Sequence, residues 1–418
     1  MKLRLTKTMQ DVQWAFIGLA ISSLVHFLLR VVLGRELGAS GLGLYTLVFT
    51  IYMFGMQFAA FGIGAALPRY IPMNCESLEK IREFISSGLI GSFLSGSIMG
   101  VLMYLFSNVI AINIFHSPEM VHLLKMTAVC FPFIALQKTA LGTLNGLRKM
   151  NYFALVNIIQ NISVFVLSII LVILFKMGVT GAVFGFVLPT IAMGLLSLFF
   201  VKDFFEVPSK LFTTTLRELY WFGFYATLIR SISTIQMQID TLLIGHFMDE
   251  TEVGYYAVAV ILIQGILLLP SAVQRVTTPT IAKYYGKNDY VSIRKVIKKT
   301  MAKTCLITII LSSSLAIFGE FLISTLFTEE FLPAYTPLLI LLIGNMIYAP
   351  FVSVGGTLSS IGKVNIVFRI SALCALVNIL LNIVWIPKFG IIGAAIATSA
   401  SLIISVAIRL YFIRKYVY

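Results

Sequence analysis

The chain has 418 residues, of which 59% are hydrophobic and 11% are charged, and its formal net charge is +14. A soluble domain carries roughly 25% charged residues, so this composition cannot supply a water-exposed surface of ordinary size. Apolar stretches of about 20 residues, each long enough to cross about 30 Å of hydrocarbon, recur along the whole length. The composition excludes a soluble globular protein and predicts an all-α membrane protein with about twelve transmembrane helices.

The expected spans follow one another with short connections, none long and polar enough to form a soluble domain. The first apolar run has no small-residue cleavage pattern behind it, so we expect it to remain as a span. In chain order we expect the spans at 13–34, 42–66, 84–108, 120–146, 152–175, 179–201, 218–245, 255–281, 300–326, 334–361, 365–386 and 390–412.

Lys and Arg side chains are divided unequally between alternate connections. With the N-terminus inside, the internal connections and the termini hold about 23 of them, and the external connections hold Arg35, Lys176 and Lys388. This asymmetry predicts a multi-pass protein of the cell membrane with both termini in the cytoplasm. The net charge therefore reflects orientation, and we expect no nucleic-acid partner.

The most basic connection is Lys283–Lys303. An interfacial amphipathic helix attracted to anionic headgroups explains this segment. Membrane orientation alone explains it equally well.

An internal repeat relates the two halves. Residues 32–45 align without gaps with residues 243–256, which superposes Gly43 on Gly254 and Tyr45 on Tyr256. Two further pairs of segments match, namely 142–151 with 356–365 and 176–182 with 388–394. Residues 154–162 also resemble 375–383, at an offset that requires compensating insertions and deletions.

Six spans per half is an even number, so the two halves have the same orientation. We therefore expect two six-helix bundles, residues 1–205 and 206–418, related by a pseudo-two-fold axis along the membrane normal. Transporters built this way bind substrate between their halves, so the architecture favours transport over catalysis.

An ionised side chain at the bilayer centre costs on the order of 2.5–3.5 kcal/mol, so cations within spans require an explanation. Arg230 lies about 18 Å into its span and Lys138 is similarly deep, at 1.5 Å per residue. We expect them to bind an anionic substrate or to line a watery cavity; structural bonds to backbone carbonyls or to Asp240 are the alternative. The shallower cations are Arg30, Arg275 and Lys125, of which the first two join the predicted substrate-binding set.

Polar residues also form stripes along three spans, and a stripe must turn away from lipid. It faces either a lumen or a neighbouring helix. The stripes are Ser22, His26 and Arg30 in the first span, Ser233, Gln236 and Asp240 in the seventh, and Gln264, Ser271, Arg275 and Thr278 in the eighth. From them we predict His26, Gln236, Gln264 and Ser271 as polar residues of the cavity.

Asp240 is the chief acidic residue within a span. We predict it as a coupling site for an ion or a proton; a counter-ion for Arg30 is the alternative. The four cysteines are scattered and no Walker motif is present, so we expect no metal, no cofactor and no ATP hydrolysis.

Several motifs carry a family resemblance over essentially the whole chain. LGRELGASGLGLYTL, FGIGAALPRYIP (61–72), IDTLLIGHF with VGYYAVA, and NIVWIPKFGIIGAAIATSAS (382–401) resemble Wzx-type polysaccharide flippases of the multidrug/oligosaccharidyl-lipid/polysaccharide exporter superfamily. The resemblance implies two six-helix bundles around a central cavity that moves isoprenoid diphosphate-linked glycans. It also implies membrane lipids and a glycan polymerase or glycosyltransferases as partners. Many members carry two additional spans that are absent here.

We therefore predict a flippase that moves a lipid diphosphate-linked oligosaccharide from the cytoplasmic to the outer leaflet, with no catalytic residues. Arg and Lys complement the diphosphate, and Arg can bind two of its oxygens at once. The alternative is a cation-coupled multidrug antiporter of the same superfamily, whose cationic substrates these cations would repel. A polytopic glycosyltransferase is disfavoured because the external loops are too short for a metal or base site.

Overall fold

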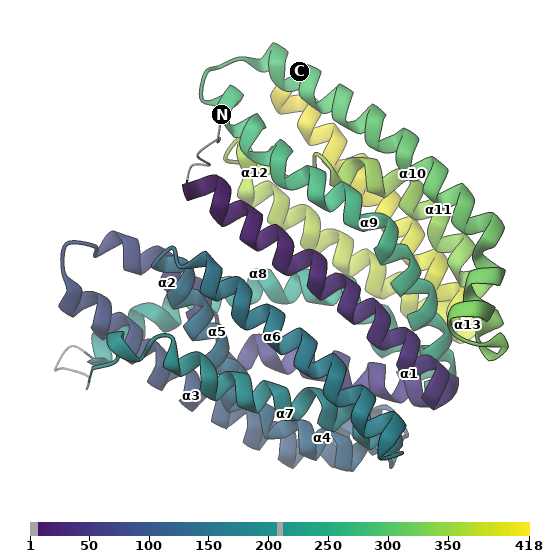
Figure 1. Ribbon diagram of the computed structural model, residues 1–418. Helices are drawn as coiled ribbons and strands as arrows, with labels where there is room; N and C mark the ends of the chain where they lie inside the picture. The colour runs from purple at the N-terminus through teal and green to yellow at the C-terminus, as the bar shows by residue number, and fades with distance from the viewer. Residues whose placement is uncertain (1–6, 207–211) are drawn as a thin grey trace, which may run out of the picture. The chain divides into compact units, whose positions relative to one another are not determined.

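The computed structural model describes residues 7–206 and 212–418, and it describes their side chains from residue 21 onward except that of residue 233. Every regular element in this part of the chain is a helix (Figure 1). The α-helices are α1 (Lys7–Ala59), α2 (Ile63–Met73), α3 (Leu78–Asn108), α4 (Met120–Ala128), α5 (Cys130–Gly146), α6 (Met150–Ile169), α7 (Gly178–Phe199), α8 (Phe212–Phe247), α9 (Glu250–Tyr285), α10 (Tyr290–Leu326), α11 (Tyr335–Val352), α12 (Thr357–Ser360) and α13 (Val364–Val417). Short π- or 3₁₀-helical turns occupy Val109–Ile114, Ile170–Leu174, Lys202–Phe204 and Glu329–Ala334.

Eight helical stretches of the described chain are long and apolar enough to cross a membrane, and a ninth forms if α4 and α5 act as one. The predicted multi-span, all-helical membrane protein is thus confirmed. The first two predicted spans lie largely within α1 and the last two within α13, and each of these elements consists of two helices that meet at a kink. Each long helix breaks at one glycine, Gly38 with φ of 69° and Gly390 with φ of 58°, in the left-handed region that glycine enters without steric cost.

The predicted span at 120–146 is broken in the structure. Helices α4 and α5 meet at a bend of 44° around Val129. Pro132 lies in the first turn of α5, where it has no N–H to donate to the carbonyl of Ala128. The proline therefore explains why one predicted span is built from two helices.

The described chain forms two compact units. Unit 1 comprises Met1–Leu37 and Leu47–Ser231, and unit 2 comprises Gly38–Thr46 and Ile232–Tyr418. The predicted boundary between residues 205 and 206 stays a prediction. These units differ from it in two places, because residues 38–46 join the second unit and the first half of α8 joins the first.

The sequence repeat corresponds to repeated backbone features. In KMGVTGA and KFGIIGA, Gly178 and Gly390 both have a positive φ, of 57° and 58°. Within unit 2, the repeat-related Gly43 and Gly254 lie side by side, since a Cβ on Gly43 would lie 2.9 Å from the backbone nitrogen of Gly254. Helices α1 and α9 therefore meet at these two glycines, where no side chain separates the backbones.

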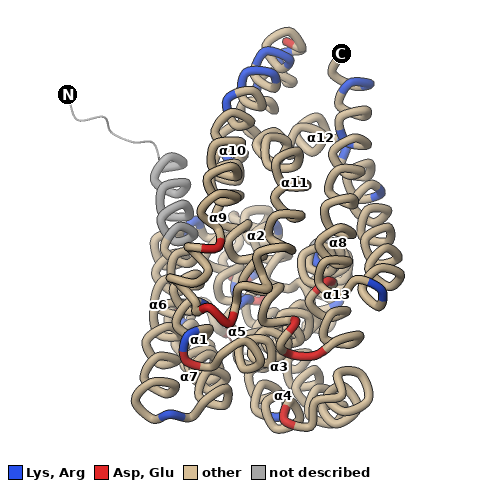
Figure 2. The backbone as a smooth tube through the Cα atoms, turned by 90° about the vertical axis from the view of Figure 1, so that its right-hand side faces the viewer, with Lys and Arg blue, Asp and Glu red and all other residues tan. Residues whose placement is uncertain are grey.

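Within unit 2, helices α9, α10, α11 and α13 pack side by side (Figure 1). The basic segment Lys283–Lys303 covers the end of α9, a turn, and the first turns of α10, where Lys and Arg gather (Figure 2). Asp289 caps α10 by accepting a hydrogen bond of 2.9 Å from the backbone N–H of Ser292. Its hydrogen bonds with Ser292 lower the pKa of the Asp289 carboxyl.

Candidate functional site

Lys138 and Arg230, the two deepest of the predicted cations, both belong to unit 1. Lys138 is half-buried on α5, and Arg230 is exposed on α8. The Arg230 guanidinium lies close enough to the Lys138 ammonium for the two charges to repel each other. Within the described part of the chain, no carboxylate lies within ion-pairing distance of Lys138. Two like charges therefore lie within electrostatic range of each other, and the anion that they are expected to bind stays a prediction.

The polar stripe of the first helix faces α6 within unit 1. The His26 side chain hydrogen-bonds Asn161 and lies in the field of the Arg30 guanidinium. The Asn161 amide also donates to the Ser22 hydroxyl at 2.7 Å. Part of this stripe thus joins two helices, which was the alternative to a lumen-facing role.

The polar stripe on α9 differs from the one on α1 in its exposure and its hydrogen bonding. Gln264 and Arg275 are exposed and Ser271 is half-buried. Among the described residues, none of these three side chains takes part in a hydrogen bond, so all three remain available to a ligand. Gln236 on α8, by contrast, donates to the backbone carbonyl of Ser371 at 3.0 Å and ties α8 to α13.

Asp240 lies at the centre of a polar network within unit 2, and its side chain is only 7% exposed. Its carboxylate accepts hydrogen bonds from the Tyr256 hydroxyl at 2.8 Å and the Asn382 amide at 2.7 Å. The Thr398 hydroxyl donates a third bond, and the Asn378 amide donates to Thr398 at 3.3 Å. Helices α8, α9 and α13 are therefore joined around one buried carboxylate.

The network leaves two buried oxygens without hydrogen-bond partners, the Oδ1 atoms of Asn378 and Asn382. The Asn382 amide nitrogen donates both to Asp240 and to the carbonyl of Asn378, which identifies the opposite end of the amide as oxygen. A buried acceptor without a partner is costly, so such atoms call for a ligand or a proton donor. The network can supply several oxygen ligands to a small hard cation.

Asp240 was predicted from the sequence, but its partners Tyr256, Asn378, Asn382 and Thr398 were not. Asn378 and Asn382 are four residues apart in an apolar run, a spacing that places both on one helix face. The matching asparagines of the first repeat, Asn157 and Asn161, have the same spacing. This pair of asparagines, present in both repeats, was the sequence feature that could have predicted the partners of Asp240. No cluster of three His, Cys, Asp or Glu side chains in the described chain suits a metal ion.

Comparison with known families matches most of the chain. The sequence pattern of a family described as "Polysaccharide biosynthesis protein" matches residues 8–285. The pattern of a second family, MatE, matches residues 226–384.

Three curated relatives resemble nearly all of the chain. A membrane protein of Methanocaldococcus jannaschii is 25% identical over 98% of this chain and 84% of its own length. A Shigella flexneri protein named for O-antigen transport is 23% identical, over 94% of each chain. A Haloferax volcanii protein named as a low-salt glycan biosynthesis flippase is also 23% identical, over 96% of this chain and 82% of its own length.

Two solved structures share the fold. The lipid II flippase MurJ, in an inward closed conformation, matches with a TM-score of 0.79 and 23% identity over 96% of this chain and 87% of its own. An inward-facing multidrug resistance transporter of the MATE family matches with a TM-score of 0.69 and 16% identity, over 96% and 98%. The chain therefore has the fold of these membrane transporters.

Proposed function

Because the chain belongs to the polysaccharide biosynthesis protein family, we propose that it is a flippase for lipid-linked glycan. It moves an isoprenoid diphosphate-linked oligosaccharide from the cytoplasmic to the outer leaflet by alternating access, for assembly of a cell-surface polysaccharide or glycan. The proposed architecture has about twelve spans in two six-helix bundles related by a pseudo-two-fold axis, with both termini cytoplasmic. The family comprises transporters and flippases, not enzymes.

The pairing of Lys138 with Arg230 carries this proposal. The repulsion from Arg230 raises the free energy of the substrate-free state at Lys138, because no carboxylate among the described residues lies within ion-pairing distance of Lys138. A diphosphate between them removes the repulsion and accepts charge-assisted hydrogen bonds from both. An organic cation would add to the repulsion, so the pair disfavours the multidrug antiporter.

Neutralising either cation tests the proposal. We expect Lys138→Ala and Arg230→Ala each to abolish surface glycan in cells that depend on this chain, while Arg230→Lys retains part of it. Lys125→Ala is the matched control, because Lys125 lies over the Tyr104 ring near the end of α4 and should keep export. Surface glycan is measured by labelling, and the amount of protein by immunoblot.

Normal glycan export by both alanine variants at wild-type protein levels would contradict the flippase proposal. Efflux of an organic cation by the wild type, with glycan export unaffected by deletion of the chain, would instead support the antiporter.

We also propose Asp240 as the coupling site. A buried carboxylate and two unpartnered amide oxygens supply negative charge and lone pairs for a cation, or a place for a proton. The neutral donors Tyr256 and Thr398 hold the carboxylate in position without cancelling its charge. This arrangement supports a coupling role over a purely structural one.

A further inference from the structure

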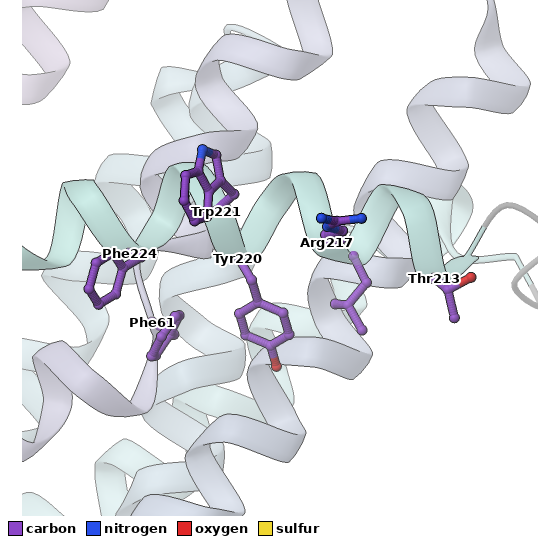
Figure 3. Close-up of a pocket in the computed structure, with 7 residues that line it drawn as sticks. Phe61, Thr213, Arg217, Tyr220, Trp221 and Phe224 are labelled. Carbon is purple, nitrogen blue, oxygen red and sulfur yellow. The ribbon is translucent and has the colours of Figure 1, made fainter.

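A groove of about 590 Å³ follows the first turns of α8 within unit 1 (Figure 3). Its volume is within the range of about 300–1,000 Å³ that is usual for clefts holding small organic ligands. Its wall is mostly aromatic or aliphatic, and among the described residues that line it Arg217 is the one charged side chain. The lining residues are Phe61, Thr213, Leu216, Arg217, Tyr220, Trp221 and Phe224.

The base of the groove is held in place by the junction between α1 and α2. Gly62 and Gly223 meet backbone to backbone, because a Cβ on Gly62 would lie 2.2 Å from the carbonyl oxygen of Gly223. Phe61, next to Gly62, has a φ of 42°, a conformation disfavoured for a bulky residue. Backbone strain of this kind persists only where the surroundings impose it, and it concentrates at functional sites.

The strained Phe61 contributes its ring to the groove. This ring meets the Tyr220 ring edge-on, with centroids 5.3 Å apart, and the Tyr220 hydroxyl donates to the carbonyl of Gly91 at 2.8 Å. The Phe224 ring lies 6.3 Å from that of Phe61. These contacts form a rigid aromatic surface before any ligand binds.

The two ends of the groove differ in character. Phe61 and Phe224 lie toward one end, and Thr213 and Arg217 lie toward the other (Figure 3). Arg217, Trp221 and Phe224 are spaced four and three residues apart, so they share one face of α8. Trp221 is 67% exposed and Phe224 is 43% exposed, so this face remains open to a ligand. The groove is therefore apolar along its length and cationic at one end.

We propose that this groove binds the lipid-linked substrate before its diphosphate reaches Lys138 and Arg230, holding the isoprenoid chain while Arg217 binds the phosphate oxygens. Arg217 precedes Arg230 by about 20 Å along α8, so the two sites act one after the other. The proposal rests on the proposed flippase function. Charge complementarity supports it, since an Arg fork binds two phosphate oxygens and an aromatic surface suits a methyl-branched chain. The groove thus provides a docking surface on α8 for the lipid part of the substrate.

Photocrosslinking tests the assignment directly. The full chain is placed in phosphatidylcholine nanodiscs with a polyprenyl diphosphate that carries a diazirine in its chain, and labelled peptides are identified by mass spectrometry. We expect adducts within residues 212–224. Excess undecaprenyl diphosphate should suppress these adducts, and equal amounts of phosphatidylglycerol, which offers the same phosphate on an acyl lipid, should not.

Substitutions at each end of the groove complete the test. We expect Arg217→Gln to lower labelling about tenfold, the loss equivalent to one charge-assisted hydrogen bond, and Arg217→Lys to lower it less. Trp221→Ala should also reduce labelling. The controls are Lys202→Gln, a basic residue whose ammonium lies over the Phe199 ring at the end of α7, and Phe321→Ala, an aromatic residue 66% exposed on α10. Both controls should be labelled like the wild type.

Equal suppression by phosphatidylglycerol would overturn the proposal, since the groove would then hold ordinary membrane lipid. Undiminished labelling of Arg217→Gln would overturn it as well. The flippase proposal is tested by a different readout, namely glycan export. Normal export by Lys138→Ala and Arg230→Ala contradicts the flippase function even if α8 is labelled. If these variants lose export but α8 is not labelled, only the groove proposal is contradicted.

Discussion

At the scale of single residues, neutral donors surround the buried carboxylate of Asp240. The Tyr256 and Thr398 hydroxyls and the Asn382 amide stabilise the ionised carboxylate without neutralising it. The two unpartnered amide oxygens beside it add further lone pairs. This local chemistry predicts that unit 2 gains stability when a small cation enters.

Asp240→Asn preserves the shape of the side chain but removes its charge. We expect the midpoint of thermal unfolding of the wild type to rise with added Na⁺, since a ligand that binds only the folded state stabilises it. The Asn variant should lose that dependence. Gln236→Ala is the control, because Gln236 bonds the Ser371 carbonyl and takes no part in the Asp240 network. An Asn variant that still responds to Na⁺ would contradict a cation site at Asp240.

Asp240 was predictable from the sequence and its partners were not, for a physical reason. A carboxylate in an apolar run is costly, so its presence alone indicates a function. Asn382 and Thr398 are neutral, and neutral polar residues in spans commonly join helices. The periodicity of a sequence shows which residues share one face of a helix, but it does not show which other helix that face contacts. The hydrogen-bond network around Asp240 could therefore be identified only from the structure.

At the scale of helices, close backbone contacts at glycines position the cations. A Cβ on Gly64 would lie 2.3 Å from the carbonyl oxygen of Lys138, and one on Gly142 would lie 2.3 Å from that of Gly64. Helices α2 and α5 can therefore meet only while both positions lack a side chain. This contact fixes the backbone of α5 at Lys138.

Gly64→Ala should separate α2 from α5, and we expect it to lower both glycan export and the thermal unfolding midpoint. Overpacking of this kind typically costs about 1–3 kcal/mol. Gly265→Ala on α9 is the matched control, because nothing lies within 4 Å of the added Cβ. That variant should be neutral or slightly more stable, since Ala favours a helix interior over Gly by about 1 kcal/mol. Equal behaviour of the two variants would show that the contact does not position Lys138.

The breaks within and between helices were only partly predictable from the sequence. Hydropathy separated two apolar runs within α1 and two within α13, and the backbone is non-helical at Gly38 and Gly390 between them, but hydropathy did not give the conformation of these two glycines. Hydropathy also did not predict the break between α4 and α5, although the sequence of the predicted span 120–146 contains Pro132. The backbone between two spans depends on local conformation, and the hydrophobic pattern carries little information about it.

At the scale of the whole molecule, the charge asymmetry predicts an orientation that Cys75 can report. Cys75 is the exposed member of the four cysteines, and it precedes α3 in a connection predicted to be cytoplasmic. We expect a membrane-impermeant maleimide to label Cys75 in inside-out vesicles and to spare it in right-side-out vesicles. In a Cys75→Ser background, Lys388→Cys should show the reverse pattern. Labelling of Cys75 from outside would contradict the positive-inside assignment.

Each compact unit contains a segment from the other half of the sequence, and this predicts how the chain behaves when it is expressed as two fragments. If the chain is made as separate fragments 1–205 and 206–418, the first fragment retains residues 38–46, which belong to unit 2. The second retains the start of α8, which belongs to unit 1. Each fragment thus carries the piece that completes its counterpart, so neither should accumulate alone, and a tag on one should recover both when they are expressed together.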